Sequence, residues 1–157
     1  MNHDEQRIWL IQELQKEDSQ LSNYPIPRDK QGQKDLLRGL MNIWIPKDYD
    51  DEFWKIHDDY LSEENRLAGI VDVQSLPPIK GDDRIILWQG DMTTLKIGAI
   101  VNPANSGMTG CWQILHSCAD NIVHSKSGLR LRQTCNCIME KQGHPEPTGQ
   151  AKITPAY

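Results

Sequence analysis

Residues 102–120, which read NPANSGMTGCWQILHSCAD, constrain this chain more than any other part of its sequence. They contain Cys111, His116 and Cys118 in the pattern C-x4-H-x-C, so three candidate metal ligands fall within eight residues. A Gly- and Asn-rich loop precedes the ligands and itself follows a strand-like run at 98–102. Three protein ligands leave a fourth coordination position open, which is typical of catalytic rather than structural zinc. The pattern therefore predicts a loop in which these three side chains meet.

Length and charge narrow the class of protein. The 157 residues allow one domain, or a small domain with an extension. The formal net charge is -5 and the basic residues are scattered, which argues against a nucleic-acid groove. No apolar run approaches the roughly 20 residues of a membrane span, and the N-terminus lacks the apolar core of a signal peptide. We therefore expect a soluble cytoplasmic protein that binds neither nucleic acid nor membrane.

All four cysteines lie between residues 111 and 137. Two disulfides are one interpretation, but reducing conditions in the cytoplasm disfavour it. Cys135 and Cys137 are two residues apart in a helical stretch, so their side chains should point in different directions. Both are more consistent with small buried hydrophobic residues than with a shared metal site. A structural zinc site completed by one of them stays open as an alternative to the catalytic site.

The first part of the chain has the apolar spacing of helices. We expect one helix over 4–21, a second over 34–45 and a third that begins near Asp50. The prolines of 23–28 should separate the first two, and Pro46 should end the second, because proline removes a backbone donor. An aromatic stripe in the third helix predicts core packing rather than a ligand site, and it consists of Phe53, Trp54, His57 and Tyr60.

After a proline-rich connection at 75–82 the pattern changes. Residues 84–88 and 99–102 are short, apolar and partly β-branched, which predicts buried strands of a parallel or mixed sheet. Residues 89–94 between them have the chemistry of a turn that starts a helix, and helical periodicity returns over 119–142. This order of elements predicts an α/β architecture.

Several polar residues could bind a ligand at the ends of these strands. Asp91 could accept a hydrogen bond from an exocyclic amine such as that of adenine, although the local sequence favours a helix cap. Asn102 and Asn105 can present amides to sugar hydroxyls, and the glycines nearby let backbone donors approach a diphosphate. Asp120 could orient a water or a ribose hydroxyl, but helix N-termini also attract aspartate for structural reasons. We expect His124 to pack inside.

Together these motifs resemble the macrodomain family, and within it the zinc-dependent macrodomains of bacterial pathogens. The residues that carry the resemblance are GDMT at 90–93, VNPANS at 101–106, the Cys/His/Cys triad, Asp120, and TGQAKIT at 148–154, where a further strand would start. The helical N-terminal part is also similar to this subfamily. The zinc triad is the most specific of these features, because ordinary macrodomains lack it.

The resemblance implies a fold and a division of the chain. The fold would be a three-layer α/β/α macrodomain with a mixed sheet that binds ADP-ribose at its strand ends. Residues 1–74 would form a helical N-terminal extension, and residues 75–157 the N-terminal portion of the macrodomain. Because the family pattern continues past 148–154, we expect a chain truncated at its C-terminus. A partial sheet would expose apolar surface and an unpaired edge, and whether this chain is active alone stays open.

The resemblance also implies how the substrate is bound. Asp91 would recognise the adenine, supported by the backbone of Met92. The two asparagines would face the distal ribose, and two glycines would belong to the loop beside the phosphates. The implied substrate-binding residues are Asp91, Met92, Asn102, Asn105, Gly107 and Gly110.

The implied reaction is hydrolysis of the bond between ADP-ribose and a modified protein side chain, with Asp120 and Asn105 as catalytic residues. A Zn²⁺ ion held by Cys111, His116 and Cys118 would orient the substrate and lower the pKa of a bound water. The implied partners are an ADP-ribosylated lipoyl-carrier protein similar to the glycine cleavage H protein, and a sirtuin-type ADP-ribosyltransferase. The alternative function is a module that binds ADP-ribose without cleaving it.

Overall fold

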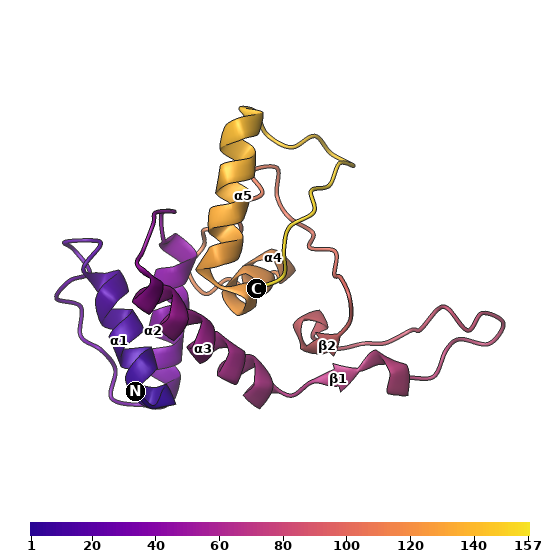
Figure 1. The fold of residues 1–157 in the computed structure, drawn as a ribbon, viewed down its shortest axis with the longest axis horizontal. Coiled ribbons are helices and arrows are strands. Elements are labelled where there is room, and N and C mark those ends of the chain that lie inside the picture. The colour runs from indigo at the N-terminus through magenta and orange to yellow at the C-terminus, as the bar shows by residue number, and fades with distance from the viewer.

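The computed structural model describes residues 1–157 and contains five α-helices and one small sheet (Figure 1). Three helices come first: α1 (His3–Gln15), α2 (Lys30–Ile43) and α3 (Asp51–Ala68). Short elements follow: β1 (Val71–Asp72), the 3-10 turns η1 (Val73–Ser75) and η2 (Met92–Thr94), and β2 (Leu95–Lys96). The last two helices are α4 (Ala119–Ser127) and α5 (Leu129–Gln142). No helix combines the length and the apolar character that crossing a membrane requires.

Polar side chains start the first three helices by accepting hydrogen bonds from otherwise unpaired backbone N–H groups. Asn2 and Glu5 form a reciprocal capping box at α1, with both bonds at 2.9 Å. Asp29 and Asp50 accept backbone N–H groups at the starts of α2 and α3, at 2.8 and 2.9 Å. The Asp29 cap explains why α2 begins at Lys30, ahead of the expected start at residue 34.

The main core lies among α1, α2 and α3, and α1 packs against both of the other helices. The aromatic stripe packs there as predicted: Phe53 stacks on Tyr49 with ring centroids 3.6 Å apart and meets Trp54 edge-on at 5.5 Å. Leu129, at the start of α5, belongs to the same cluster, so the C-terminal helices are anchored to the N-terminal ones. Its members are Leu10, Ile11, Leu14, Leu37, Leu40, Met41, Trp44, Phe53, Trp54, Ile56, Tyr60 and Leu129.

The stretch 119–142, where the sequence showed helical periodicity throughout, forms two helices that are separated at Gly128. Its φ is +77°, and a Cβ atom there would lie 2.4 Å from the ring of His57, so only glycine fits this close approach. The Nε2 atom of His57 accepts a hydrogen bond from the Leu129 N–H at 3.1 Å, which satisfies a donor in the first turn of α5. His57 is therefore a buried structural residue that joins α3 to α5.

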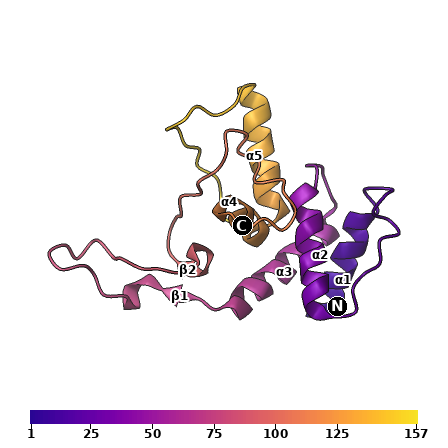
Figure 2. The ribbon, with the colours of Figure 1, turned by 180° about the vertical axis from the view of Figure 1, so that it is seen from behind.

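The strand predictions for 84–88 and 99–102 are wrong, and 148–154 forms no strand either. The one sheet consists of β1 paired in parallel with β2, with Val71 opposite Leu95. Figures 1 and 2 show the chain between β1 and β2 as a long excursion away from the helices. The parallel pair is consistent with an α/β class, but these residues do not form the expected three-layer arrangement or a larger mixed sheet.

The segments that were expected to be buried strands expose their apolar side chains instead. Leu87 and Val101 are each 87% exposed, and Ile153 is 95% exposed. A strand satisfies its backbone only by pairing with a neighbouring strand, and no neighbour lies beside these segments. Apolar surface is therefore exposed as expected, but through unpaired segments and not through the edge of the partial sheet that was predicted.

Candidate metal centre

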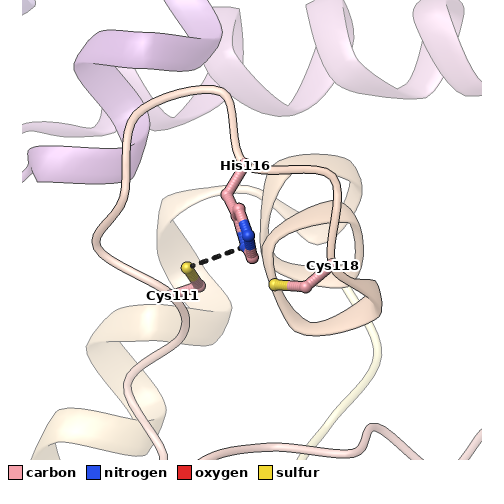
Figure 3. Close-up of side chains that lie close together, drawn as sticks. All are labelled: Cys111, His116 and Cys118. Atoms are coloured by element: carbon pink, nitrogen blue, oxygen red, sulfur yellow. Dashed lines mark hydrogen bonds between the residues drawn. The ribbon is translucent and has the colours of Figure 1, made fainter.

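Cys111, His116 and Cys118 meet in the loop that leads into α4, with their side chains directed toward one another (Figure 3). Their ligand atoms all lie within 4.8 Å of one another, and the Cys111 Sγ atom is 3.6 Å from the His116 Nδ1 atom. All three side chains are half-buried, and both thiols are free. The structure thus brings together the three residues that the spacing predicted would meet.

The donor set fits zinc or another thiophilic divalent metal, because two thiolates and an imidazole are ligands that zinc readily takes. Ligand atoms this close allow one ion to contact all three side chains. Cys135 is buried on α5 and Cys137 is exposed, and neither belongs to the group of converging ligand atoms. The arrangement therefore favours three protein ligands with one open position over a four-ligand structural site.

Asp120, in the first turn of α4, is buried and accepts hydrogen bonds from both asparagines of the preceding loop. Asn102 Nδ2 donates to Asp120 Oδ1 at 2.8 Å, and Asn105 Nδ2 donates to Asp120 Oδ2 at 3.3 Å. The same Asn105 nitrogen also donates to the carbonyl oxygen of Gly110 at 3.1 Å, directly before the first metal ligand. The carboxylate, the two amides and the triad loop therefore form one continuous group.

Two buried polar atoms beside Asp120 have no hydrogen-bond partner, namely Asn102 Oδ1 and His124 Nδ1. Buried polar atoms are nearly always paired in folded proteins, so unpaired ones are candidates for contact with a ligand. Burial lowers the pKa of His124 to about 4, although Asp120, 3.7 Å away, acts in the opposite direction. His124 is therefore neutral at neutral pH and packs inside, as predicted.

The two glycines that the resemblance places beside the phosphates shape the loop. Gly110 has a φ of +85°, and a Cβ atom there would lie 2.8 Å from the His124 ring, so a larger residue would displace the histidine. The N–H of Gly107 donates to Asn105 Oδ1 at 2.8 Å. That donor is therefore already used within the loop, and phosphate contact by either glycine stays a prediction.

Asp91 and Met92 have no hydrogen bond to the Asp120 group. The Asp91 carboxylate accepts from the backbone N–H of Thr93 at 2.9 Å and from its hydroxyl at 2.7 Å, which caps η2. Asp91 also lines a cleft of about 330 Å³ between α2, α3 and α4. Met92 packs on the small core of α4 and α5, which includes Val123. The capping role of Asp91 is therefore confirmed, while adenine recognition stays a prediction.

Two residues that the sequence did not single out hold the triad loop. Asn121 is fully buried, and its Nδ2 atom donates to the carbonyl oxygen of Cys111 at 3.4 Å. Arg38 on α2 donates to Asn121 Oδ1 and to the carbonyl oxygen of His116, both at 2.7 Å. No local signal identifies this pair, because the two residues are 83 positions apart.

Arg132 on α5 was also missed. It is almost fully buried, donates to the carbonyl oxygen of Asn42 at 2.7 Å and lies 4.3 Å from the ring centroid of Trp112. Burial lowers its pKa to about 10, with Asp120 and Cys111 acting in the opposite direction. The guanidinium therefore stays charged at neutral pH and holds Trp112, the residue after the first ligand, against α5.

Fold and site together define an α/β chain in which a candidate metal loop adjoins a carboxylate and two amides suited to a hydroxyl-rich ligand. The family model described as Macro domain matches residues 101–157. That range includes the triad, Asp120, both asparagines and both glycines. The helices α1 to α3 lie outside it.

Curated relatives are similar over a longer stretch. The chain is 49% identical over 159 residues to a protein-ADP-ribose hydrolase of Treponema medium, which covers 100% of this chain and 61% of the relative. It is 42% identical over 149 residues to the protein-ADP-ribose hydrolase of Staphylococcus aureus (strain MRSA252), covering 95% of this chain and 55% of the relative. The chain thus spans less than two thirds of the length of either relative. These similarities extend over the N-terminal helices, which lie outside the range that the Macro domain model matches.

A shorter similarity connects the chain to a fungal protein. A probable bifunctional ADP-ribose hydrolase/ADP-ribosyltransferase of Fusarium oxysporum f. sp. cubense is 44% identical over 78 residues. The matched stretch covers 49% of this chain and 13% of the fungal protein.

Proposed function

We propose that this chain acts in the zinc-dependent removal of ADP-ribose from mono-ADP-ribosylated protein side chains. The observation that carries the proposal is the convergence of Cys111, His116 and Cys118 in a loop continuous with Asp120 and its two asparagines. The names of the relatives support the class of reaction, and the donor set supports zinc. When bound by the triad, zinc would supply Lewis-acid polarisation of an oxygen at the bond to be cleaved.

The chain's own residues would orient the substrate. The unpaired Asn102 Oδ1 atom can accept a hydrogen bond from a ribose hydroxyl while Asp120 holds the nitrogen of the same amide. Each Asp120 oxygen accepts one amide N–H and retains a second acceptor position for a hydroxyl or a water. Asn105 fixes the loop between Asp120 and Gly110, which keeps this carboxylate next to the metal ligands. Asp120 and Asn105 are therefore the proposed catalytic pair.

The second candidate function is a module that binds ADP-ribose without hydrolysing it. One observation favours it: both carboxylate oxygens of Asp120 already accept hydrogen bonds from amides. A carboxylate used in this way fits a residue that shapes a binding loop as well as one that takes part in a reaction. Only a reaction measurement separates the two functions.

The family resemblance also supports more specific proposals. The natural substrate would be an ADP-ribosylated lipoyl-carrier protein similar to the glycine cleavage H protein, and a sirtuin-type ADP-ribosyltransferase would supply the modification. A cytoplasmic location fits the chemistry of the triad, because both ligand thiols must be reduced to bind a metal.

The test is ADP-ribose release from a mono-ADP-ribosylated lipoyl-carrier protein by the zinc-loaded chain, with a chelator-treated sample in parallel. Cys118→Ala should lose retained zinc and ADP-ribose release together. Cys137→Ala is the matched control, because it removes an exposed thiol outside the triad and should change neither. Undiminished release after zinc has been shown to be absent would contradict the role of the metal. Tight binding of ADP-ribose by the zinc-loaded chain without release would select the binding module.

A further inference from the structure

Asn121 contacts two of the three candidate metal ligands directly. Its backbone N–H donates to the Cys118 Sγ atom at 3.4 Å, and its side-chain nitrogen donates to the carbonyl oxygen of Cys111 at 3.4 Å. The same nitrogen donates to the carbonyl oxygen of Gln113 at 3.0 Å, between the first and second ligands. Because Asn121 is completely buried, these bonds are shielded from competing water.

Arg38 fixes Asn121 and the third ligand at the same time. One guanidinium nitrogen donates to Asn121 Oδ1 and to the His116 carbonyl oxygen, both at 2.7 Å, and Nε donates to Ser125 Oγ at 3.2 Å. These bonds orient the Asn121 amide so that its nitrogen faces Cys111. All three ligands are thus connected to α2 through one arginine and one asparagine.

Asn42, one turn further along α2, holds the middle of the loop. Its Oδ1 atom accepts the N–H of Leu115 at 3.0 Å, and the side chain is buried. Leu115 has a φ of +55°, a left-handed conformation that a leucine adopts only where its surroundings impose it. The loop also lies close to the helix, because a Cβ atom on Gly39 would be 3.3 Å from Ile114.

We infer that Arg38 and Asn42 of α2 are positioning residues for the metal centre, which set the separation of Cys111, His116 and Cys118. This inference rests on the proposed metal function. It assigns to the N-terminal helices a part in building the site, in addition to their own core. Residues that orient metal ligands through hydrogen bonds typically change metal affinity by roughly 10- to 100-fold when they are replaced.

The variants are Arg38→Lys and Asn42→Ala. Lysine keeps the positive charge, but its nitrogen lies one bond closer to the backbone than the guanidinium nitrogen that bonds both Asn121 and His116, and it has no counterpart of Nε. The bond to Ser125 is therefore lost, and the other two are lengthened or lost. The matched control is Arg130→Lys, the same replacement at the contact of α5 with α3. Arg130 bonds Asp58 at 2.8 Å and lies over Trp54, and it has no hydrogen bond to the triad loop.

The first readout is the affinity for Co²⁺, a visible-absorbing substitute for zinc, measured by titration of the metal-free chain. Arg38→Lys and Asn42→Ala should each weaken binding by roughly 10- to 100-fold, while Arg130→Lys stays within about twofold of the unmodified chain. Binding by both α2 variants that equals that of the unmodified chain would overturn the inference. Equal weakening in Arg130→Lys would also overturn it, because the effect would then be general destabilisation.

The second readout needs no metal. Hydrogen exchange of the metal-free chain should become at least about tenfold faster in residues 111–118 of both α2 variants. Asn42→Ala removes the acceptor of the Leu115 N–H, and Arg38→Lys weakens the bond that holds the neighbouring His116 carbonyl oxygen. Exchange in α1 and α3 should not change, which shows that the variants are folded. If the unmodified chain binds no Co²⁺, the metal function fails, and hydrogen exchange still decides whether α2 positions the loop. Unchanged exchange in 111–118 would refute that positioning.

Discussion

The helices α1 to α3 and the segment 84–101 are both rich in apolar residues, yet only the helices bury theirs. Phe53 on α3 is 2% exposed, whereas Leu87 is 87% exposed. A helix pairs its backbone groups within its own segment, so three amphipathic helices can form a core from nearby sequence. A strand needs a second strand for its backbone bonds, and within 84–101 only Leu95–Lys96 has one, in β1. An apolar segment therefore packs into a core or stays extended according to whether its backbone groups find partners within the segment or need them from elsewhere in the chain.

The triad loop lies between these two extremes. It contains no helix or strand, as in 84–88, but its backbone groups are bonded to side chains of α2 and α4. The loop thus owes its order to residues distant in sequence.

Truncation of apolar side chains should separate the two regions most strongly. Phe53→Ala removes a buried ring stacked on Tyr49 and should lower the free energy of unfolding by about 3 to 5 kcal/mol. Leu87→Ala removes an exposed side chain and should change it by less than about 0.5 kcal/mol. Urea unfolding followed by circular dichroism measures both. A large loss in Leu87→Ala would show that 84–101 is packed in solution, which would remove the contrast between the regions.

Acid should destabilise the fold through His124, which lies behind the triad loop. The histidine has a pKa near 6.5 in the unfolded chain, and burial lowers it to about 4 in the folded chain. The unfolded chain therefore binds a proton that the folded chain excludes between these values, so stability is complete above pH 6.5 and falls as the pH drops toward 4. This lowering of the pKa corresponds to roughly 3 kcal/mol.

The His124 effect is isolated by urea unfolding of the unmodified chain and of His124→Gln at pH 7 and pH 4.5. Glutamine does not titrate, so the variant should lose clearly less stability over this interval. An identical loss in both chains would show that the His124 side chain is exposed to solvent. It would also contradict the burial of the group that His124 forms with Asp120.

Helix caps should give the smallest contrast. Asp50 caps the 18-residue helix α3, and Asp50→Ala should cost about 1 kcal/mol. Asp91 makes the same kind of bond in the three-residue turn η2, so Asp91→Ala should cost less than about 0.5 kcal/mol. Asp91→Ala should weaken ADP-ribose binding, measured by calorimetry, more than it changes stability. Unaltered ADP-ribose affinity would leave Asp91 as a cap only.

The parts of the fold that the sequence predicted are those fixed by local interactions. The helical periodicity located α1 to α3 and the aromatic core, although α1 ends at Gln15 and not at residue 21. The spacing of Cys111, His116 and Cys118 predicted their convergence. The exact helix starts depended on caps such as Asp29, which lies outside the apolar pattern.

The sequence failed where the structure depends on distant partners. The β-branched residues of 84–88 and 99–102 indicated strands, but this pattern cannot specify whether a neighbouring strand is present. Arg38 gave no signal either, because its bonds join α2 to Asn121 and His116 across about half the chain. A polar residue beside the apolar face of a helix is common, and only the fold shows which one reaches a site.

The metal centre is tested most directly by titrating zinc into the metal-free chain while alkylation of each cysteine is followed by peptide mapping. One equivalent of zinc should bind per chain and protect Cys111 and Cys118, while the accessibility of Cys135 and Cys137 stays unchanged. Protection of Cys135 or Cys137 together with the triad would indicate a four-ligand structural site. Failure to bind zinc, or binding that leaves Cys111 and Cys118 fully reactive, would contradict the metal centre.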